Sequence, residues 1–213
     1  MILSNVELFK ALDEKRLIIT PEPAPRYPSI EQSHSPFDTH SVDLRLADEI
    51  SVPKKGQQVT FDVTKPGRIA DTIKEHSETE RITARRPFLL VPNLFVLGKT
   101  VERISLPIKD GETTCLAARI EGKSSRARFG VLVHFTAPTV HPGWDGTLTL
   151  EIINLGSTDF LLIPGMAIAQ LIVEEVKGCP ARHLSQFQGQ TTAAGLVAER
   201  NGHAIGAASS GPN

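Results

Sequence analysis

The sequence predicts a mainly β protein, an antiparallel sandwich or barrel with one short helix near its N-terminus. Many short segments alternate apolar and polar residues with period two, which is typical of half-buried strands. The chain has 16 glycines and 15 prolines, and many of them fall in turns between these segments. Its 213 residues are enough for one sizeable domain with an apolar core.

The helix is predicted over residues 5–15. Ser4 and Glu7 have the spacing of a capping box, in which the serine accepts from the helix N-terminus. Leu8 and Leu12 then repeat at helical spacing.

The rest of the chain to about residue 173 is predicted as strands and turns. Residues 21–36 contain five prolines and indicate an irregular surface loop. The charged stretch 71–81 is compatible with a loop or a short helix. The expected strands cover residues 41–46, 59–63, 88–92, 94–98, 115–120, 131–135, 147–154, 160–163 and 167–173.

Composition excludes several classes of protein. The net charge of −1 does not favour bulk DNA or an acidic membrane surface, so any phosphate must be bound locally. Two cysteines cannot form a disulfide framework, which fits a reducing compartment. Acidic residues interrupt the N-terminal segment and no long apolar run follows, so neither a signal peptide nor a membrane helix is expected. We expect a cytoplasmic protein that binds neither nucleic acid nor a membrane.

Residues 120–154 contain the groups best suited to chemistry. A small-residue, cationic segment, GKSSRAR at residues 122–128, precedes an apolar strand. Hydroxyls, a lysine and arginines suit a polyphosphate, although the segment is not a P-loop. The alternative is that its serines only cap turns and its arginines are solvated.

The strand at residues 147–154 carries one carboxylate, Glu151, which could accept and deliver protons. Thr147, Thr149 and Glu151 share one face, and that face could line a cleft or face water. Trp144, the only tryptophan, lies in the turn before this strand. It could be a packing residue or stack against a sugar or base.

Zinc chemistry is not expected. His76 and Glu78 match the H-x-E of zinc nucleoside deaminases, but the P-C-x-x-C partner of that motif is absent. The end of the chain, rich in Ala, Gly, Ser and Thr, reads as a disordered end or as a lid whose first residues order over a ligand. We expect one β domain at residues 1–190 and a flexible tail at 191–213.

Eight segments of residues 1–190 form a recognisable set: the N-terminal segment 1–21, SVDLRL at 41–46, PNLFVLGKTVE at 92–102, EGKSSRARFG at 121–130, VHFTA at 133–137, PGWDG at 142–146, LEIIN at 150–154 and PGMAIAQ at 164–170. Together they resemble the dCTP deaminase family of the trimeric dUTPase-like superfamily. It implies a distorted antiparallel β-barrel, jelly-roll-like, assembled as a homotrimer with active sites between subunits. It also implies hydrolytic deamination of dCTP to dUTP and ammonia, with Mg²⁺ carried by the triphosphate, no zinc, and dTTP as a possible inhibitor.

The same resemblance assigns roles to residues of this chain. Glu151 is expected to be the general base, with Ser124 and Arg128 holding the glutamate and the water, and backbone groups of Ala137 reading the cytosine edge. The residues expected to bind the nucleotide are Lys123, Ser124, Ser125, Arg126, Arg128, His141, Trp144, Thr149, Leu150, Gln170 and Gln190.

The chain also departs from the family pattern. His141 stands where the family usually has an aspartate, Arg126 stands in place of a leucine, and QFQGQ at residues 186–190 lacks a Lys-Tyr pair. Arg126 could replace the missing phosphate cation. Three alternatives to a simple deaminase remain. Two of them, a bifunctional enzyme forming dUMP and pyrophosphate and a plain dUTPase, need pyrophosphatase activity, which His141 argues against. The third is a non-catalytic nucleotide-binding regulator.

Overall fold

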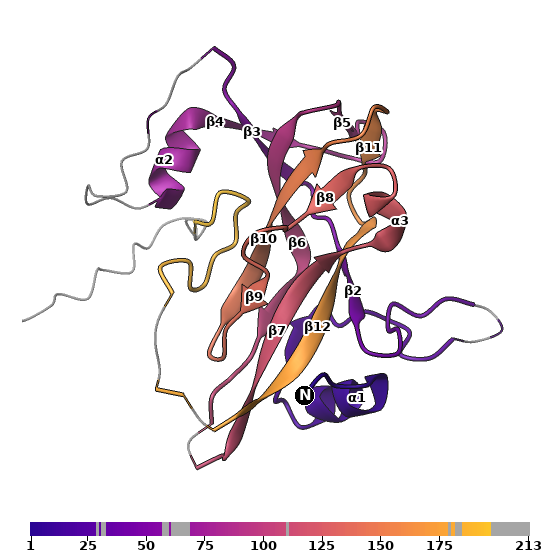
Figure 1. Cartoon of the computed structure of the whole chain (residues 1–213), viewed down its shortest axis with the longest axis vertical. Coiled ribbons are helices and arrows are strands. Elements are labelled where there is room, and N and C mark those ends of the chain that lie inside the picture. The colour runs from indigo at the N-terminus through magenta and orange to yellow at the C-terminus, as the bar shows by residue number, and fades with distance from the viewer. Residues whose placement is uncertain are drawn as a thin grey trace, which may run out of the picture.

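The protein was analysed as a computed structural model that describes residues 1–28, 30, 33–56, 60, 69–109, 111–178, 180–181 and 185–196. It is mainly β, with long strands crossing the molecule and a helix at one end (Figure 1). The helices are α1 (Asn5–Asp13), α2 (Ile69–His76) and α3 (Ser124–Ala127). The strands are β1 (Ile18–Thr20), β2 (Val42–Arg45), β3 (Glu49–Pro53), β4 (Ser77–Arg81), β5 (Phe88–Leu90), β6 (Phe95–Ser105), β7 (Thr114–Gly122), β8 (Val131–Val133), β9 (Thr139–Val140), β10 (Asp145–Asn154), β11 (Phe160–Leu162) and β12 (Ala167–Lys177).

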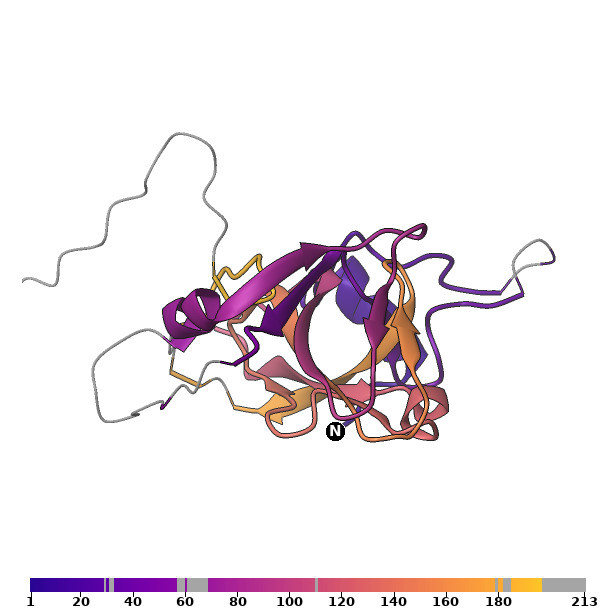
Figure 2. The ribbon, with the colours of Figure 1, turned by 90° about the horizontal axis from the view of Figure 1, so that it is seen from above.

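The strands form three antiparallel sheets. One has the order β4-β3-β6-β10-β8, with β1 also paired to β6; the second is β2-β12-β7-β9; the third is the pair β11-β5. Seen from above, the sheets curve around a common interior (Figure 2). An isolated bridge between Leu46 and Thr100 links the first two sheets, which do not otherwise close into a continuous barrel over the described residues.

Alternation along the strands explains the core. β10 buries every second residue, including the fully buried Leu150 and Ile152, and these pack in one cluster with Leu44 and Ile50. At one end of the sheets, α1 adds its apolar face to the same cluster.

The predicted helix is confirmed, two residues shorter than expected. Ser4 Oγ accepts from the backbone N–H of Glu7 at 3.5 Å, as a capping serine does. The helix ends at Asp13, and Lys15 has a φ of 54°, in the left-handed region.

Most predicted strands are confirmed, with shifted ends. Segment 94–98 is the start of β6, which runs on to Ser105. Of the predicted strand 59–63 only residue 60 is described, and the rest lies outside the described residues. The stretch 71–81 divides into most of α2 and the whole of β4. The sequence analysis missed β4 because its side chains are mostly exposed and its pairing with β3 defines it. Residues 21–36 form neither helix nor an extended strand where they are described.

Close backbone packing fixes the start of β8. Gly130 has a φ of +84°, and its carbonyl accepts from the backbone N–H of Leu155 at 2.8 Å. A Cβ at Gly130 would lie 2.3 Å from the backbone nitrogen of Gly156. Only a glycine fits this crossing without moving the backbone.

We therefore expect Gly130→Ala to lower the free energy of unfolding by about 2 kcal/mol or more, because strain and a backbone clash add together. Gly165→Ala is the matched control, since Gly165 has the same φ of +84° but open space around it. Its expected cost is about 1 kcal/mol. Denaturant unfolding at one protein concentration measures the free energy of unfolding of both variants. Equal decreases in the two variants would show that the close approach of Gly130 to Gly156 adds no cost.

Candidate active site

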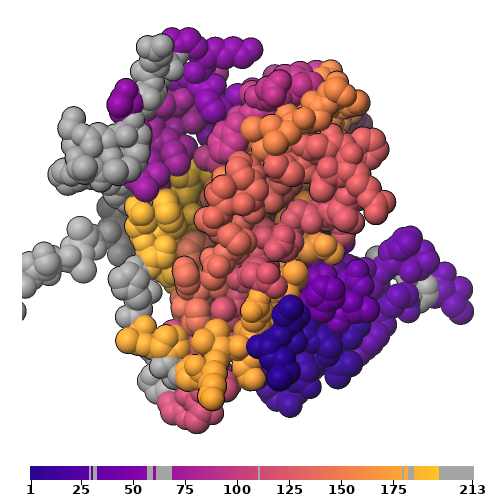
Figure 3. All heavy atoms as spheres, in the orientation of Figure 1, coloured from indigo at the N-terminus to yellow at the C-terminus, as the bar shows by residue number. Residues whose placement is uncertain are grey.

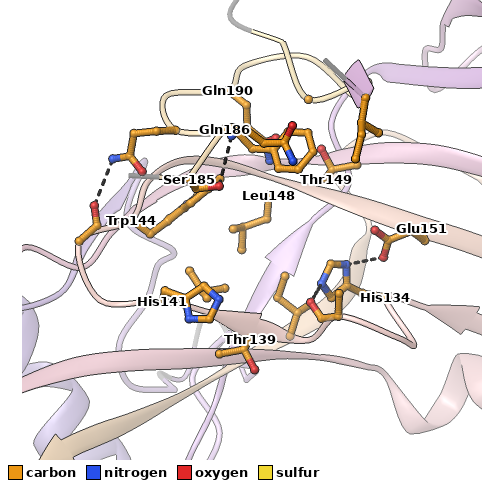
Figure 4. A pocket seen from close by; sticks show the side chains of 18 of the residues that line it. His134, Thr139, His141, Trp144, Leu148, Thr149, Glu151, Ser185, Gln186 and Gln190 are labelled. Atoms are coloured by element: carbon orange, nitrogen blue, oxygen red, sulfur yellow. Dashed lines mark hydrogen bonds and ion pairs between the residues drawn. The ribbon is translucent and has the colours of Figure 1, made fainter. Parts of the chain in front are cut away.

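A cavity of about 920 Å³ opens on one side of the first sheet. Its walls come from β10, the segment between β8 and β10, α2, and the C-terminal residues 185–195 (Figures 3 and 4). This volume is typical of a small-molecule site. The polar residues on the wall are His134, Thr139, His141, Thr149, Glu151, Ser185, Gln186, Gln188 and Gln190. Of the described residues that line it, none is a lysine or an arginine.

An acid–histidine pair lies on this wall. β8 and β10 pair with Ile152 opposite Val133, so the next position brings His134 opposite Glu151. The backbone N–H of His134 donates to the carbonyl of Glu151 at 2.8 Å. The side chains also meet, with His134 Nδ1 and Glu151 Oε2 only 2.7 Å apart (Figure 4).

The contact made by the other ring nitrogen of His134, Nε2, determines which tautomer of the neutral imidazole is present. His134 Nε2 lies 2.7 Å from the carbonyl oxygen of Ala137, which can only accept, so Nε2 carries a proton. In a neutral ring, the Nδ1 lone pair would then face the Glu151 carboxylate. Protonation of Nδ1 replaces that repulsion by an ion pair.

The pKa of His134 is accordingly raised above its ordinary 6.5. Burial of the ring is the largest single influence and lowers the pKa, but the contact with Glu151 and its charge, helped by the carbonyls of Ala137 and Thr149, outweigh it. The ion pair therefore stabilises the folded protein fully below about pH 6.5. That contribution is lost as the pH rises through the folded-state pKa.

One buried polar atom on the same wall, Thr149 Oγ1, has no hydrogen-bond partner in the described part of the chain. Glu151 Oε2 and His134 Nδ1 lie 2.7 Å apart and pair with each other when the imidazole is protonated. Buried polar groups are normally satisfied. A ligand with a polar group at this point would satisfy the Thr149 hydroxyl.

The remaining predicted residues on the wall are His141, Trp144 and Gln190. His141 is exposed and Trp144 is half-buried, with its indole N–H 3.3 Å from the carbonyl of Gly146. The side chain of Gln190 donates to the carbonyl of Thr147 at 2.8 Å, so it holds the C-terminal segment against β10. Leu150 is fully buried in the core, and its side chain does not line the cavity.

A second group of predicted residues lies at or near α3 and does not line this cavity in one protomer. Lys123 Nζ lies 2.5 Å from Asp43 Oδ1, and the Gln170 amide donates to the same carboxylate at 3.4 Å. Arg126 stacks over the Phe160 ring at 5.8 Å. The exposed members of the group are Ser124, Ser125 and Arg128.

Sequence reasoning did not place His134 among the site residues. Its signal is the register between β8 and β10, which a single sequence does not give. Thr139, Gln186 and Gln188 were also missed, because they lie in segments without a clear period.

The described residues contain no group of three or more His, Cys, Asp or Glu side chains arranged to hold a metal ion. Among the helices in the described ranges, none combines the length and apolar character needed to cross a membrane.

The fold and this cavity define a mainly β protein with a small-molecule pocket that contains an acid–histidine pair. A family model described as dCTP deaminase-like matches residues 2–176. The chain is 36% identical over 171 residues to a Dictyoglomus turgidum protein named "dCTP deaminase, dUMP-forming", covering 80% of this chain and 78% of the relative. It is 34% identical over 178 residues to a Rhodospirillum rubrum protein named "dCTP deaminase", covering 82% of each. The chain therefore belongs to the dCTP deaminase-like family.

A solved structure supports the same fold. The 2′-deoxycytidine 5′-triphosphate deaminase from Agrobacterium tumefaciens superposes with a TM-score of 0.55 at 16% identity. The match covers 81% of this chain and 47% of that one, so the present chain spans less than half of that protein.

The pairing of His134 with Glu151 predicts a specific titration. We expect the imidazole of His134, followed by NMR, to titrate above pH 6.5 in the unmodified protein and at a lower pH in Glu151→Gln. The amide removes the negative charge that favours the imidazolium. An unshifted His134 midpoint in Glu151→Gln would contradict the ion pair.

Proposed function

We propose that the protein hydrolyses dCTP to dUTP and ammonia, with Glu151 as the general base. The observation that carries the proposal is the position of the Glu151 carboxylate on the cavity wall, close to His134 and beside the orphaned Thr149 hydroxyl. Membership of the dCTP deaminase-like family supports the substrate class.

The proposed reaction needs one group that moves protons twice. Water adds to C4 of the cytosine ring while Glu151 takes its proton and delivers it to N3. Glu151 then carries the second proton of the new hydroxyl to the 4-amino group. The C4–N bond breaks, ammonia leaves, and the ring retains a C4 carbonyl and an N3–H.

His134 and Thr149 have supporting roles in this proposal. The imidazolium of His134 holds one Glu151 oxygen, which orients the other toward the ring. The Thr149 hydroxyl, without a hydrogen-bond partner among the described residues, would bind a polar edge of the substrate. Backbone groups of Ala137 remain the proposed reader of the cytosine edge, with His141 and Trp144 beside the sugar.

The triphosphate is proposed to bind at the junction of two protomers in a homotrimer. The cations and hydroxyls suited to phosphate lie near α3, away from the cavity of their own protomer, and the cavity offers no lysine or arginine on its described wall. A second copy could supply Lys123, Ser124, Ser125, Arg126 and Arg128. Mg²⁺ would arrive with the triphosphate and offset its negative charge.

Replacement of Glu151 tests the proposed base. Glu151→Gln keeps the shape of the side chain but cannot accept a proton, so we expect kcat for ammonia release from dCTP to fall by about 10²- to 10⁴-fold. The Kd for dCTP should change little. Turnover that survived in Glu151→Gln would rule out this assignment, and binding without turnover in the unmodified protein would favour the non-catalytic regulator.

A second candidate function is the bifunctional reaction, in which dUTP is cleaved further to dUMP and pyrophosphate. It is favoured by the name of the Dictyoglomus turgidum relative, which is called dUMP-forming. His141 argues against it here, since an imidazole replaces the aspartate that would steer water toward the α-phosphate. Pyrophosphate appearing together with ammonia in a dCTP assay with Mg²⁺ would establish the bifunctional reaction.

Mixing two inactive variants tests the shared site. Glu151→Gln removes the base from the cavity of its own protomer, and Arg128→Ala alters the group at α3. If each site combines both surfaces from different copies, a refolded equal mixture should regain about a quarter of the unmodified activity. A mixture as inactive as its two components, despite mixed trimers detected by mass spectrometry, would place both groups in one protomer.

A further inference from the structure

Residues 185–196 form a strap beside β10 (Figure 1), and several of its side chains line the cavity (Figure 4). Two backbone hydrogen bonds attach it to the start of β10: the N–H of Gly189 donates to the carbonyl of Asp145 at 2.8 Å, and the N–H of Thr147 donates to the carbonyl of Gln190 at 3.1 Å. The strap then turns back on itself, with the N–H of Thr191 bonded to the carbonyl of Leu196 at 2.8 Å.

Outside the cavity, two charged side chains, Glu49 of β3 and Lys99 of β6, form hydrogen bonds to the backbone of the strap. Glu49 Oε1 accepts from the backbone N–H of Ala193 at 2.7 Å, and Lys99 Nζ donates to the carbonyl of Thr191 at 2.5 Å. The two side chains are 3.8 Å apart and nearly buried, with side-chain exposures of 6% for Glu49 and 16% for Lys99. Ala193 is itself fully buried.

The pairing of β3 with β6 brings Glu49 and Lys99 together. β3 and β6 are antiparallel with Ser51 opposite Leu97, and continuing that register brings Glu49 opposite Lys99. Burying two charges is costly unless each is paired and hydrogen-bonded. Here the backbone of the strap supplies hydrogen bonds that both charges need, so opening the strap would leave them less satisfied.

We propose that Glu49 and Lys99 act as a latch that keeps residues 185–196 closed over the cavity and thereby controls ligand entry and release. Neither side chain lines the cavity, so both are positioning residues. The identity of the retained ligand as dCTP rests on the function proposed above. The latch itself can be tested without any nucleotide.

Trp144 provides an internal reporter, since it is the only tryptophan and lines the cavity under the strap. Lys99→Met keeps the length of the side chain but removes the bond to Thr191, and Glu49→Gln/Lys99→Met removes both charges together. We expect acrylamide to quench Trp144 more strongly in both variants. Amide hydrogen exchange at Ala193 should be faster by about tenfold or more, with core amides of β7 and β12 unchanged.

Arg81→Gln is the matched control. Arg81 also contacts Glu49, at 3.1 Å, but its side chain is 63% exposed and no described contact joins it to the strap. It should leave the exchange of Ala193 nearly unchanged, and Lys99→Arg should restore most of the protection. Unchanged exchange and quenching in both Lys99→Met and the double variant would overturn the latch, whatever the protein does to dCTP.

The ligand is tested separately. In stopped-flow displacement, dCTP should dissociate about tenfold faster from Lys99→Met, and its KM should rise more than its kcat falls. An opened strap with unchanged dCTP dissociation, in a protein that deaminates dCTP, would overturn the role in ligand retention. An opened strap in a protein that never deaminates dCTP would contradict the proposed function while supporting the latch.

Discussion

The pairing of β8 with β10 is the constraint on which the site depends. Its register puts His134 opposite Glu151, and a slip by one residue would turn one of the two side chains to the other face of the sheet. Asn154 stabilises the end of this pairing. Its fully buried amide donates to the carbonyls of Leu90 and Thr158, and its side-chain oxygen accepts from the N–H of Gly156. One polar side chain thus joins β10 to β5 and to the turn before β11.

Much of the fold follows from local pattern. Alternation identified β10 and the capping serine identified α1, because in both cases the residues themselves carry the signal. The strands that were missed depend on their partners. They are β1, β3, β4 and β9. β9 has only two residues and pairs with the longer β7, and β4 exposes most of its charged side chains and pairs with β3, so the pairing defines each of these two strands. Partner choice over long sequence separations is not encoded in a local period.

The candidate site, too, could be predicted from the sequence only in part. The resemblance to known motifs indicated Glu151 and Trp144, and both line the cavity. The resemblance also implied active sites between subunits, and the residues at α3 do not line the cavity of their own chain. The motifs did not indicate His134, because they describe order along the chain and not distance in space. The latch could not have been inferred from sequence either, since Glu49 and Lys99 are unremarkable until β3 and β6 pair.

The separation of charge between the two surfaces has a physical rationale under the proposed function. Phosphates require fixed cations, whereas the proposed base needs a partner that orients the carboxylate. The described wall of the cavity offers a histidine beside Glu151, whose charge can change, and α3 presents Arg126 and Arg128 elsewhere on the protomer. A site assembled from two copies would bring Lys123 and Arg126 to the phosphates, and would bring Arg128 toward the glutamate and the water as the resemblance implies. This arrangement also explains how a chain with a net charge of −1 could bind a polyanion, because the necessary positive charge is local.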